Sequence, residues 1–191
     1  MSTPLMGPGP VLETPRMILR PPGLEDFPRW AESMAHESAR FIGGPLETPA
    51  AAWRPFMTMV GAWALTGIGM FSLIEKDTGL WMGRIGPWQP LDWPGNEVGW
   101  GVHPEAAGRG LALEAAEASM DYAFDVLGWA DVIHCIAPDN IPSQRLAMKL
   151  GSRNQGPTRL PPPYHEAAVD RWGQSRADWA VNRLKPPAER G

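Results

Sequence analysis

The amino-acid sequence predicts an α/β fold whose sheet is part antiparallel and part parallel. Apolar segments of strand length alternate with longer amphipathic segments, in the order strand, two helices, three strands, helix, strand, helix, strand. Residues 69–76 and 81–88 flank a turn of Asp77, Thr78 and Gly79, which is typical of a hairpin of antiparallel strands. A length of 191 residues is consistent with one domain that has a sizeable core.

The first half of the chain is predicted to hold one strand and two helices before this hairpin. Residues 17–20 are expected to form a strand that ends at two prolines. Residues 24–39 and 49–66 have helical character, and residues 48–49 offer the second helix a threonine N-cap and a first-turn proline. Residues 1–12, rich in proline and glycine, are expected to be a flexible leader.

The clearest helix is predicted over residues 111–127, and Gly128 suits the position just after its end. Its predicted buried face consists of Leu113, Ala116, Met120, Ala123, Phe124 and Leu127. Its other face carries an acidic stripe of Glu114, Glu117, Asp121 and Asp125.

Strands are expected on both sides of this helix, at residues 97–103 and 131–137. Asn140 then caps a further helix, which Gly151 ends. The remaining elements are a proline-rich loop at 158–165, a last strand at 167–172 and a flexible tail at 185–191, so that the folded domain is expected to span residues 13–184.

Composition excludes several classes of function. A formal net charge of -4 gives no general attraction to nucleic acid or to an anionic membrane. The single cysteine, Cys135, can form no internal disulfide, and no histidine spacing is typical of a metal site. Because no segment approaches the roughly 20 apolar residues of a membrane span and the N-terminus does not look like a signal peptide, we expect a cytoplasmic protein.

The strongest chemical signal is a turn between a strand and the 111–127 helix. Gly108 and Gly110 allow the backbone to approach a ligand closely, and the amides that open the helix favour an anion such as phosphate. Arg109 would add a positive charge. Taken alone, two glycines before a helix more often form only a tight turn. A dinucleotide fingerprint and a Walker-type phosphate loop are both poor matches, since a third glycine and a Gly-Lys-Ser/Thr are absent.

The turn resembles the acyl-CoA-binding motif of the GNAT (Gcn5-related) N-acetyltransferases, written Gln/Arg-x-x-Gly-x-Gly/Ala. Residues 107–112 read Ala-Gly-Arg-Gly-Leu-Ala, so only the first position, Ala107, departs from the motif. Residues 137–151 resemble the family's Asn-x-x-Ser…Lys-Leu-Gly segment, and residues 13–20 and 170–179 resemble the two ends of its RimJ/RimL-like branch.

The resemblance implies a single-domain GNAT-like fold: a mixed, mostly antiparallel sheet with a central strand splay and helices on both faces. It also implies direct transfer of an acetyl or acyl group from acetyl-CoA to a primary amine, with no metal. The residues implied to bind acetyl-CoA are Trp100, Gly101, Val102, Ala107, Gly108, Arg109, Gly110, Leu111, Ala112 and Asn140. A bulge at the first three of these would place the amide of Val102 near the acyl carbonyl.

Two residues are implied to be catalytic. Glu97 is the candidate general base, and we expect it to be partly buried among tryptophans 81, 88 and 100. Ser143 is the candidate proton donor to the departing thiolate. A solvated strand glutamate and a capping serine remain open as alternatives, as does a purely capping role for Asn140. The tyrosine common in the family is replaced by Ala147, and Tyr164 is a possible substitute.

The acceptor is expected to be a protein N-terminus or a small-molecule amine, and a homodimer stays open. Two other functions also stay open: a CoA-binding regulatory module without turnover, and an α/β protein whose 108–110 turn binds a nucleotide.

Overall fold

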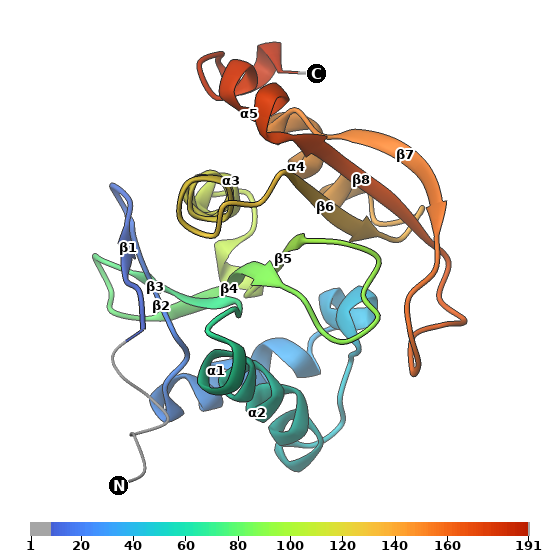
Figure 1. Cartoon of the computed structure of the whole chain (residues 1–191). Coiled ribbons are helices and arrows are strands. Elements are labelled where there is room, and N and C mark those ends of the chain that lie inside the picture. The colour runs from blue at the N-terminus through green and yellow to red at the C-terminus, as the bar shows by residue number, and fades with distance from the viewer. Residues whose placement is uncertain (1–8, 191) are drawn as a thin grey trace, which may run out of the picture. The chain divides into compact units, whose positions relative to one another are not determined.

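The computed structural model describes residues 9–190, and the chain forms two compact units (Figure 1). Among the described residues, one unit comprises 9–86 together with 100–118, and the other comprises 87–99 together with 119–190. The strands follow the order β1-β2-β3-β4-β5-β6-β8-β7, and β5 (Glu97–Val102) contributes to both units. The predicted α/β class is confirmed, since β5 and β6 are parallel whereas the other described pairs are antiparallel.

The strands of the first unit include the predicted hairpin. Its two strands pair antiparallel as expected, and the register shifts once between Leu73 and Ile74. Leu12, the last residue of the predicted leader, already lies in a short strand, while the leader's first eight residues lie outside the described part of the chain. The four strands are β1 (Leu12–Glu13), β2 (Met17–Arg20), β3 (Phe71–Glu75) and β4 (Trp81–Trp88).

Two packed helices, α1 (Phe27–Ala35) and α2 (Pro49–Thr66), follow β2 in this unit (Figure 1). The α2 helix has the predicted bounds. Thr48 Oγ1 accepts a hydrogen bond from the amide of Ala51 at 3.2 Å, and the helix ends at Gly67 with φ 68°. The other predicted helix is shorter than expected and is flanked by 3-10 turns at Leu24–Asp26 and Glu37–Ile42.

Aromatic side chains from these helices and strands form the core of the first unit. Trp30 packs against Phe56 and Trp81, and Trp63 packs against Phe71. All five side chains are buried. The abundance of tryptophan in the sequence therefore corresponds, at these positions, to core packing.

The predicted 111–127 helix is an α-helix, α3 (Leu111–Asp121), that continues into a π-helical turn at Tyr122–Val126. Its buried side differs by a small rotation from the predicted one. Leu113 is partly exposed, whereas Leu111 and Ala115 are fully buried. The acidic stripe is also more than a solvated face, because its carboxylates form ion pairs with arginines: Glu114 with Arg16, Asp121 with Arg183, and Asp125 with Arg176.

Two elements of the second unit were not predicted from the sequence. They are the edge strand β7 (Arg153–Thr158) and the C-terminal helix α5 (Arg176–Asn182). The strand β8 lies between β6 and β7, and the unpredicted helix α5 follows it directly (Figure 1). The elements are β6 (Asp131–Ile136), α4 (Ile141–Leu150), β7 (Arg153–Thr158), β8 (Val169–Ser175) and α5 (Arg176–Asn182). The predicted tail contains a 3-10 turn at Pro187–Glu189. No helix of residues 9–190 is long and apolar enough to span a bilayer.

A buried polar network connects the elements of this unit around His134 of β6. Its Nδ1 lies 2.7 Å from the carbonyl oxygen of Val98, and its Nε2 lies 3.0 Å from Ser152 Oγ. Because a carbonyl only accepts, Nδ1 carries the proton and Ser152 donates to Nε2. Gln174 of β8 donates to Ser152 Oγ at 3.0 Å, and Asn182 of α5 donates to Gln174 at 3.2 Å.

Candidate active site

The backbone of the predicted phosphate-binding turn is left-handed at both of its glycines. After a 3-10 turn at Pro104–Ala106, Gly108 and Gly110 take φ values of 74° and 77°, and α3 begins at the next residue. The first helical hydrogen bond runs from the amide of Glu114 to the carbonyl of Gly110, at 3.3 Å. The amides of residues 111–113 therefore precede the helical ladder and are available to a ligand. Positive charge at a helix N-terminus favours phosphate there.

The stretch before the turn is anchored by His103, whose side chain is 2% exposed. The amide of His103 donates to the carbonyl of Met82 at 2.9 Å. Its Nδ1 accepts from the amide of Glu105 at 3.3 Å and lies 3.2 Å from a guanidinium nitrogen of Arg29, so the ring proton is on Nε2. Burial and the charge of Arg29 lower the pKa of His103. A neutral imidazole thus fixes the turn to α1.

The side chain of Arg109 is already paired within the protein. Its guanidinium forms an ion pair with Glu75 of β3, a carboxylate that is 5% exposed. This contact is the main cause that lowers the pKa of Glu75. The positive charge expected from Arg109 for a phosphate is therefore matched by a buried carboxylate that the sequence did not single out.

Residues 100–102 end β5 in the first unit, next to Gly83 of β4, which no sequence motif singles out. A Cβ atom at Gly83 would lie 2.7 Å from the carbonyl oxygen of Gly101 and 2.8 Å from Cα of Val102. The φ of Gly83 is 146°, which other residues rarely adopt. A Cβ at Gly101 would in turn lie 2.8 Å from Ile42. The two glycines thus permit close backbone approach where the resemblance implies contact with the thioester.

Glu97, the candidate base, lies in the second unit and is more buried than expected, at 6% exposure. One carboxylate oxygen accepts a hydrogen bond from Trp93 Nε1, and the other accepts from the amide of Cys135 at 3.1 Å. The tryptophan that donates this hydrogen bond, Trp93, was not among the predicted neighbours of Glu97. The carboxylate therefore connects β5 to β6 and to the loop that precedes β5.

Asn140 and Ser143 lie at the start of α4, where Asn140 is the N-cap. Asn140 Oδ1 accepts from the amide of Ser143 at 3.3 Å. Asn140 is therefore the N-cap residue of α4, and Ser143 lies in the first turn of this helix. Ala147, where many family members carry tyrosine, is fully buried, and Tyr164 is 45% exposed in the loop before β8.

Comparison with known proteins decides the family. The family model described as acetyltransferase (GNAT) domain matches residues 16–153, which is most of the chain. The chain belongs to the GNAT acetyltransferase family. It is 33% identical over 86 residues to the uncharacterized N-acetyltransferase YnaD of Bacillus subtilis. This match spans 45% of the chain and about half, 51%, of that relative.

Solved acetyltransferase structures share the fold over nearly the whole chain. A crystal structure of an acetyltransferase from Agrobacterium tumefaciens is 31% identical and has a TM-score of 0.73, covering 91% of this chain and 100% of that one. The ribosomal-protein-S5-alanine acetyltransferase of Vibrio fischeri shares the fold, with 16% identity, a TM-score of 0.68, and coverage of 88% of this chain and 98% of that one.

Cys135 and His134 do not form a nucleophilic pair in this GNAT domain. Burial and the neighbouring Glu97 raise the pKa of the Cys135 thiol, which disfavours the thiolate. His134 is committed to Val98 and Ser152 in the network described above. Among residues 9–190, no group of three or more His, Cys, Asp or Glu side chains is arranged to hold a metal ion.

Proposed function

We propose that the protein transfers an acetyl group from acetyl-CoA to a primary amine by direct attack on the thioester. The observation that carries this proposal is the turn at residues 108–110. It has two left-handed glycines followed at once by open helix amides, and it lies within the matched GNAT domain. The space beside Gly108 is open, since a Cβ there would meet no protein atom within 4 Å. These features fit the pyrophosphate of CoA.

The remaining acetyl-CoA contacts follow from the motif positions. Backbone groups of Ala107 to Ala112 would hold the phosphates, and Trp100, Gly101 and Val102 would accompany the pantetheine and thioester. The close approach of Gly83 to Gly101 supports this role, because it leaves backbone rather than side chains at that part of β5. Asn140 would contact the CoA arm through its amide nitrogen, since its oxygen caps α4.

The chemistry requires two proton movements. The amine nitrogen forms a bond to the acetyl carbon while the carbon–sulfur bond breaks, the nitrogen loses a proton, and the sulfur gains one. Glu97 is the proposed base, directly or through a water, and Ser143 is the proposed donor to sulfur. The support for Glu97 is its position two residues before Gly99 on β5 and its ionisable, hydrogen-bonded carboxylate. Oxyanion stabilisation is assigned to the amide of Val102.

The acceptor class is proposed from the resemblance to the RimJ/RimL-like branch, together with the name of the Vibrio fischeri protein, which refers to ribosomal protein S5. A protein N-terminus is one candidate, and a small-molecule amine is the other. The net charge of -4 mildly favours a cationic acceptor.

A second function, CoA binding without turnover, has specific support. Both oxygens of Glu97 already accept hydrogen bonds, Ala107 replaces the usual polar residue, and a fully buried alanine occupies the usual tyrosine position. In this alternative, acetyl-CoA would stabilise the fold and regulate a partner.

Thermal unfolding and thiol release together separate these functions. The melting temperature would be measured with acetyl-CoA, ATP and NAD, and thiol release would be followed with a panel of amines and N-terminal peptides. The proposal expects stabilisation by acetyl-CoA alone and amine-dependent thiol release. Stabilisation without release by any acceptor would favour the regulatory module, and no stabilisation would refute the assignment of the 107–112 motif.

A further inference from the structure

The phosphate turn lacks a free cation at both positions where the sequence would place one. Ala107 occupies the first motif position, where Gln or Arg is usual. Arg109 is paired with Glu75, whose carboxylate is almost fully buried. Withdrawing Arg109 would leave a buried carboxylate without its main partner, which is costly. The charge of Arg109 is therefore balanced by Glu75, although 45% of the arginine side chain stays exposed.

Another arginine reaches the same turn from a distant part of the sequence. Arg16 lies just before β2, and its Nη1 donates a hydrogen bond to the carbonyl oxygen of Arg109 at 2.9 Å. Its Nη2 lies 3.5 Å from the point that a Cβ of Gly110 would occupy. The guanidinium thus lies against Arg109 and Gly110, the two residues that complete the turn directly before α3.

Arg16 is held in this place by Glu114, in the first turn of α3. The Nε of Arg16 donates to one oxygen of Glu114 at 2.7 Å, and the amide of Arg16 donates to the other at 2.8 Å. Thr14 Oγ1 also donates to this carboxylate, at 2.5 Å. Together these contacts outweigh the burial of Glu114 and lower its pKa, so the carboxylate stays ionised. We call Thr14, Arg16 and Glu114 the N-terminal clamp.

The clamp leaves much of the guanidinium accessible. The side chain of Arg16 is 49% exposed, and its described hydrogen bonds use only Nε and one N–H of Nη1. Of the five N–H donors of an arginine, three therefore remain for an oxygen-rich anion. A guanidinium matches phosphate oxygens in charge and in fork geometry.

We propose that Arg16 supplies the positive charge of the CoA phosphate site, in place of the side chain missing at Ala107. This inference rests on the proposed function and makes Arg16 a binding residue that lies outside the motif. The phosphate contacted belongs to CoA. It is either the pyrophosphate or the 3′-phosphate, since both present anionic phosphate oxygens to a guanidinium.

Binding of acetyl-CoA by Arg16→Gln tests the inference. The dissociation constant, measured by calorimetry at low and high ionic strength, is expected to rise about tenfold, which corresponds to about 1.4 kcal/mol. The salt dependence of binding is expected to become shallower, because one charge–phosphate contact is lost. Arg16→Lys is expected to lose less affinity. Ala107→Arg added to Arg16→Gln is expected to recover at least half of the loss.

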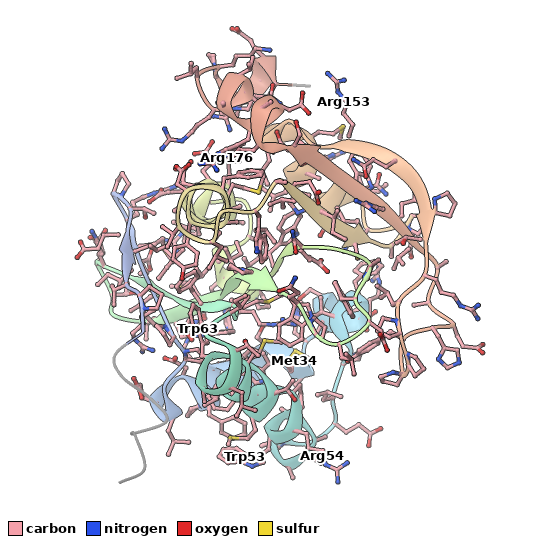
Figure 2. All side chains as sticks on the ribbon, viewed as in Figure 1. Met34, Trp53, Arg54, Trp63, Arg153 and Arg176 are labelled. Atoms are coloured by element: carbon pink, nitrogen blue, oxygen red, sulfur yellow. The ribbon has the colours of Figure 1, made fainter. Side chains whose placement is uncertain are left out.

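A matched control removes a similar ion pair elsewhere. Arg176, labelled in Figure 2, pairs with Asp125 at 3.2 Å, also near one end of the same helical segment, and is 54% exposed. Arg176→Gln is expected to bind acetyl-CoA like the wild type. Dephospho-acetyl-CoA then separates the two phosphates: the effect of Arg16→Gln persists with it if the pyrophosphate is contacted and disappears if the 3′-phosphate is contacted.

Two results would overturn the inference. One is an unchanged dissociation constant and salt dependence in both Arg16 variants, while the wild type binds. The other is a loss of affinity that neither salt nor Ala107→Arg alters, which would make Arg16 only a support of the turn. Failure of the wild type itself to bind acetyl-CoA would instead refute the proposed function.

Discussion

At the scale of single residues, Glu97 has an observed structural role, and the proposed mechanism adds a catalytic one. Its carboxylate accepts hydrogen bonds from Trp93 and from the backbone of Cys135, and the proposed mechanism asks it to accept a proton as well. A base that is also a structural acceptor is well fixed in position. Its replacement therefore affects stability and chemistry together, and the two effects must be measured separately.

Glu97→Gln is expected to lower kcat/KM about 100-fold or more through loss of the base. It is also expected to lower the free energy of unfolding by about 1–3 kcal/mol, because the new amide group would face one of the two donors. Steady-state kinetics across pH and denaturant unfolding measure the two effects, and the acid limb of the pH–rate profile should disappear.

Trp93→Phe is the control for this prediction. It removes the indole donor but keeps the carboxylate, so stability should fall while the acid limb remains. If Glu97→Gln and Trp93→Phe gave the same kinetics and kept the same acid limb, Glu97 would be structural only.

The left-handed glycine at 108 gives a second prediction at this scale. Gly108→Ala is expected to cost about 1 kcal/mol of stability from backbone strain alone, because φ is 74° and no atom lies near the added Cβ. Gly128 has φ 70° and equally open surroundings, so Gly128→Ala should cost about the same. Only Gly108→Ala should also weaken acetyl-CoA binding, as measured by calorimetry. Equal binding by the two variants would contradict the assignment of the turn.

The residues of the turn were predictable from sequence, but their partners were not. Two glycines before an amphipathic helix are a local pattern, and the structure shows the expected φ values at both. The contacts of Arg109 with Glu75 and of Arg16 with Glu114 join residues far apart in the chain. One-dimensional spacing contains no signal for such pairs. Gly83 was missed for the same reason, since its requirement comes from a neighbouring strand.

At the scale of elements, the strength of the local sequence signal explains much of what was predicted and what was missed. The α2 helix has a threonine cap, a first-turn proline and a terminal glycine, and its predicted bounds are confirmed. The strand β7 was missed because Arg153–Thr158 is polar, mostly exposed and contains a proline, as edge strands permit. The α5 helix has a capping box of Ser175 and Asp178, a signal that was available but not used.

The N-cap of α4 gives a prediction for that element. Asn140→Ala is expected to lower the free energy of unfolding by about 1 kcal/mol, because the amide of Ser143 loses its acceptor. Asn140→Asp keeps the acceptor and should restore stability. If Asn140 also contacts the CoA arm, the aspartate variant should be stable yet bind acetyl-CoA more weakly than the wild type. Thermal unfolding and calorimetry on the two variants measure these effects, and unaltered binding by both would leave Asn140 a cap only.

At the scale of the whole molecule, buried histidines predict how stability depends on pH. Burial lowers the pKa of His134 to about 4, and burial together with Arg29 lowers that of His103. The unfolded chain thus binds protons at higher pH than the folded one. Stability is full above about pH 6.5 and falls as the pH drops towards 4. For His134 alone, the loss approaches about 3 kcal/mol.

Denaturant unfolding between pH 4 and pH 8 measures this dependence. His134→Gln should start from lower stability but show a flatter profile between pH 6.5 and 4. His165→Gln is the control, because that side chain is 42% exposed, and it should keep the wild-type profile. A wild-type profile that is flat down to pH 4.5 would contradict the protonation state assigned to the buried network. Loss of stability at still lower pH is expected from carboxylates whose pKa is lowered by their partners, such as Glu75 and Glu114.

The order of strands in the second unit has a consequence for the synthesis of the protein. The strand β8 lies between β6 and β7, although it is made after both. While the ribosome is still adding residues before Val169, β6 has no antiparallel neighbour and β7 has no partner at all. Both expose unpaired strand edges to other nascent chains. We therefore expect translation arrested before β8 to give aggregation-prone chains that are sensitive to protease, and arrest with β8 and α5 fully emerged to give protected ones.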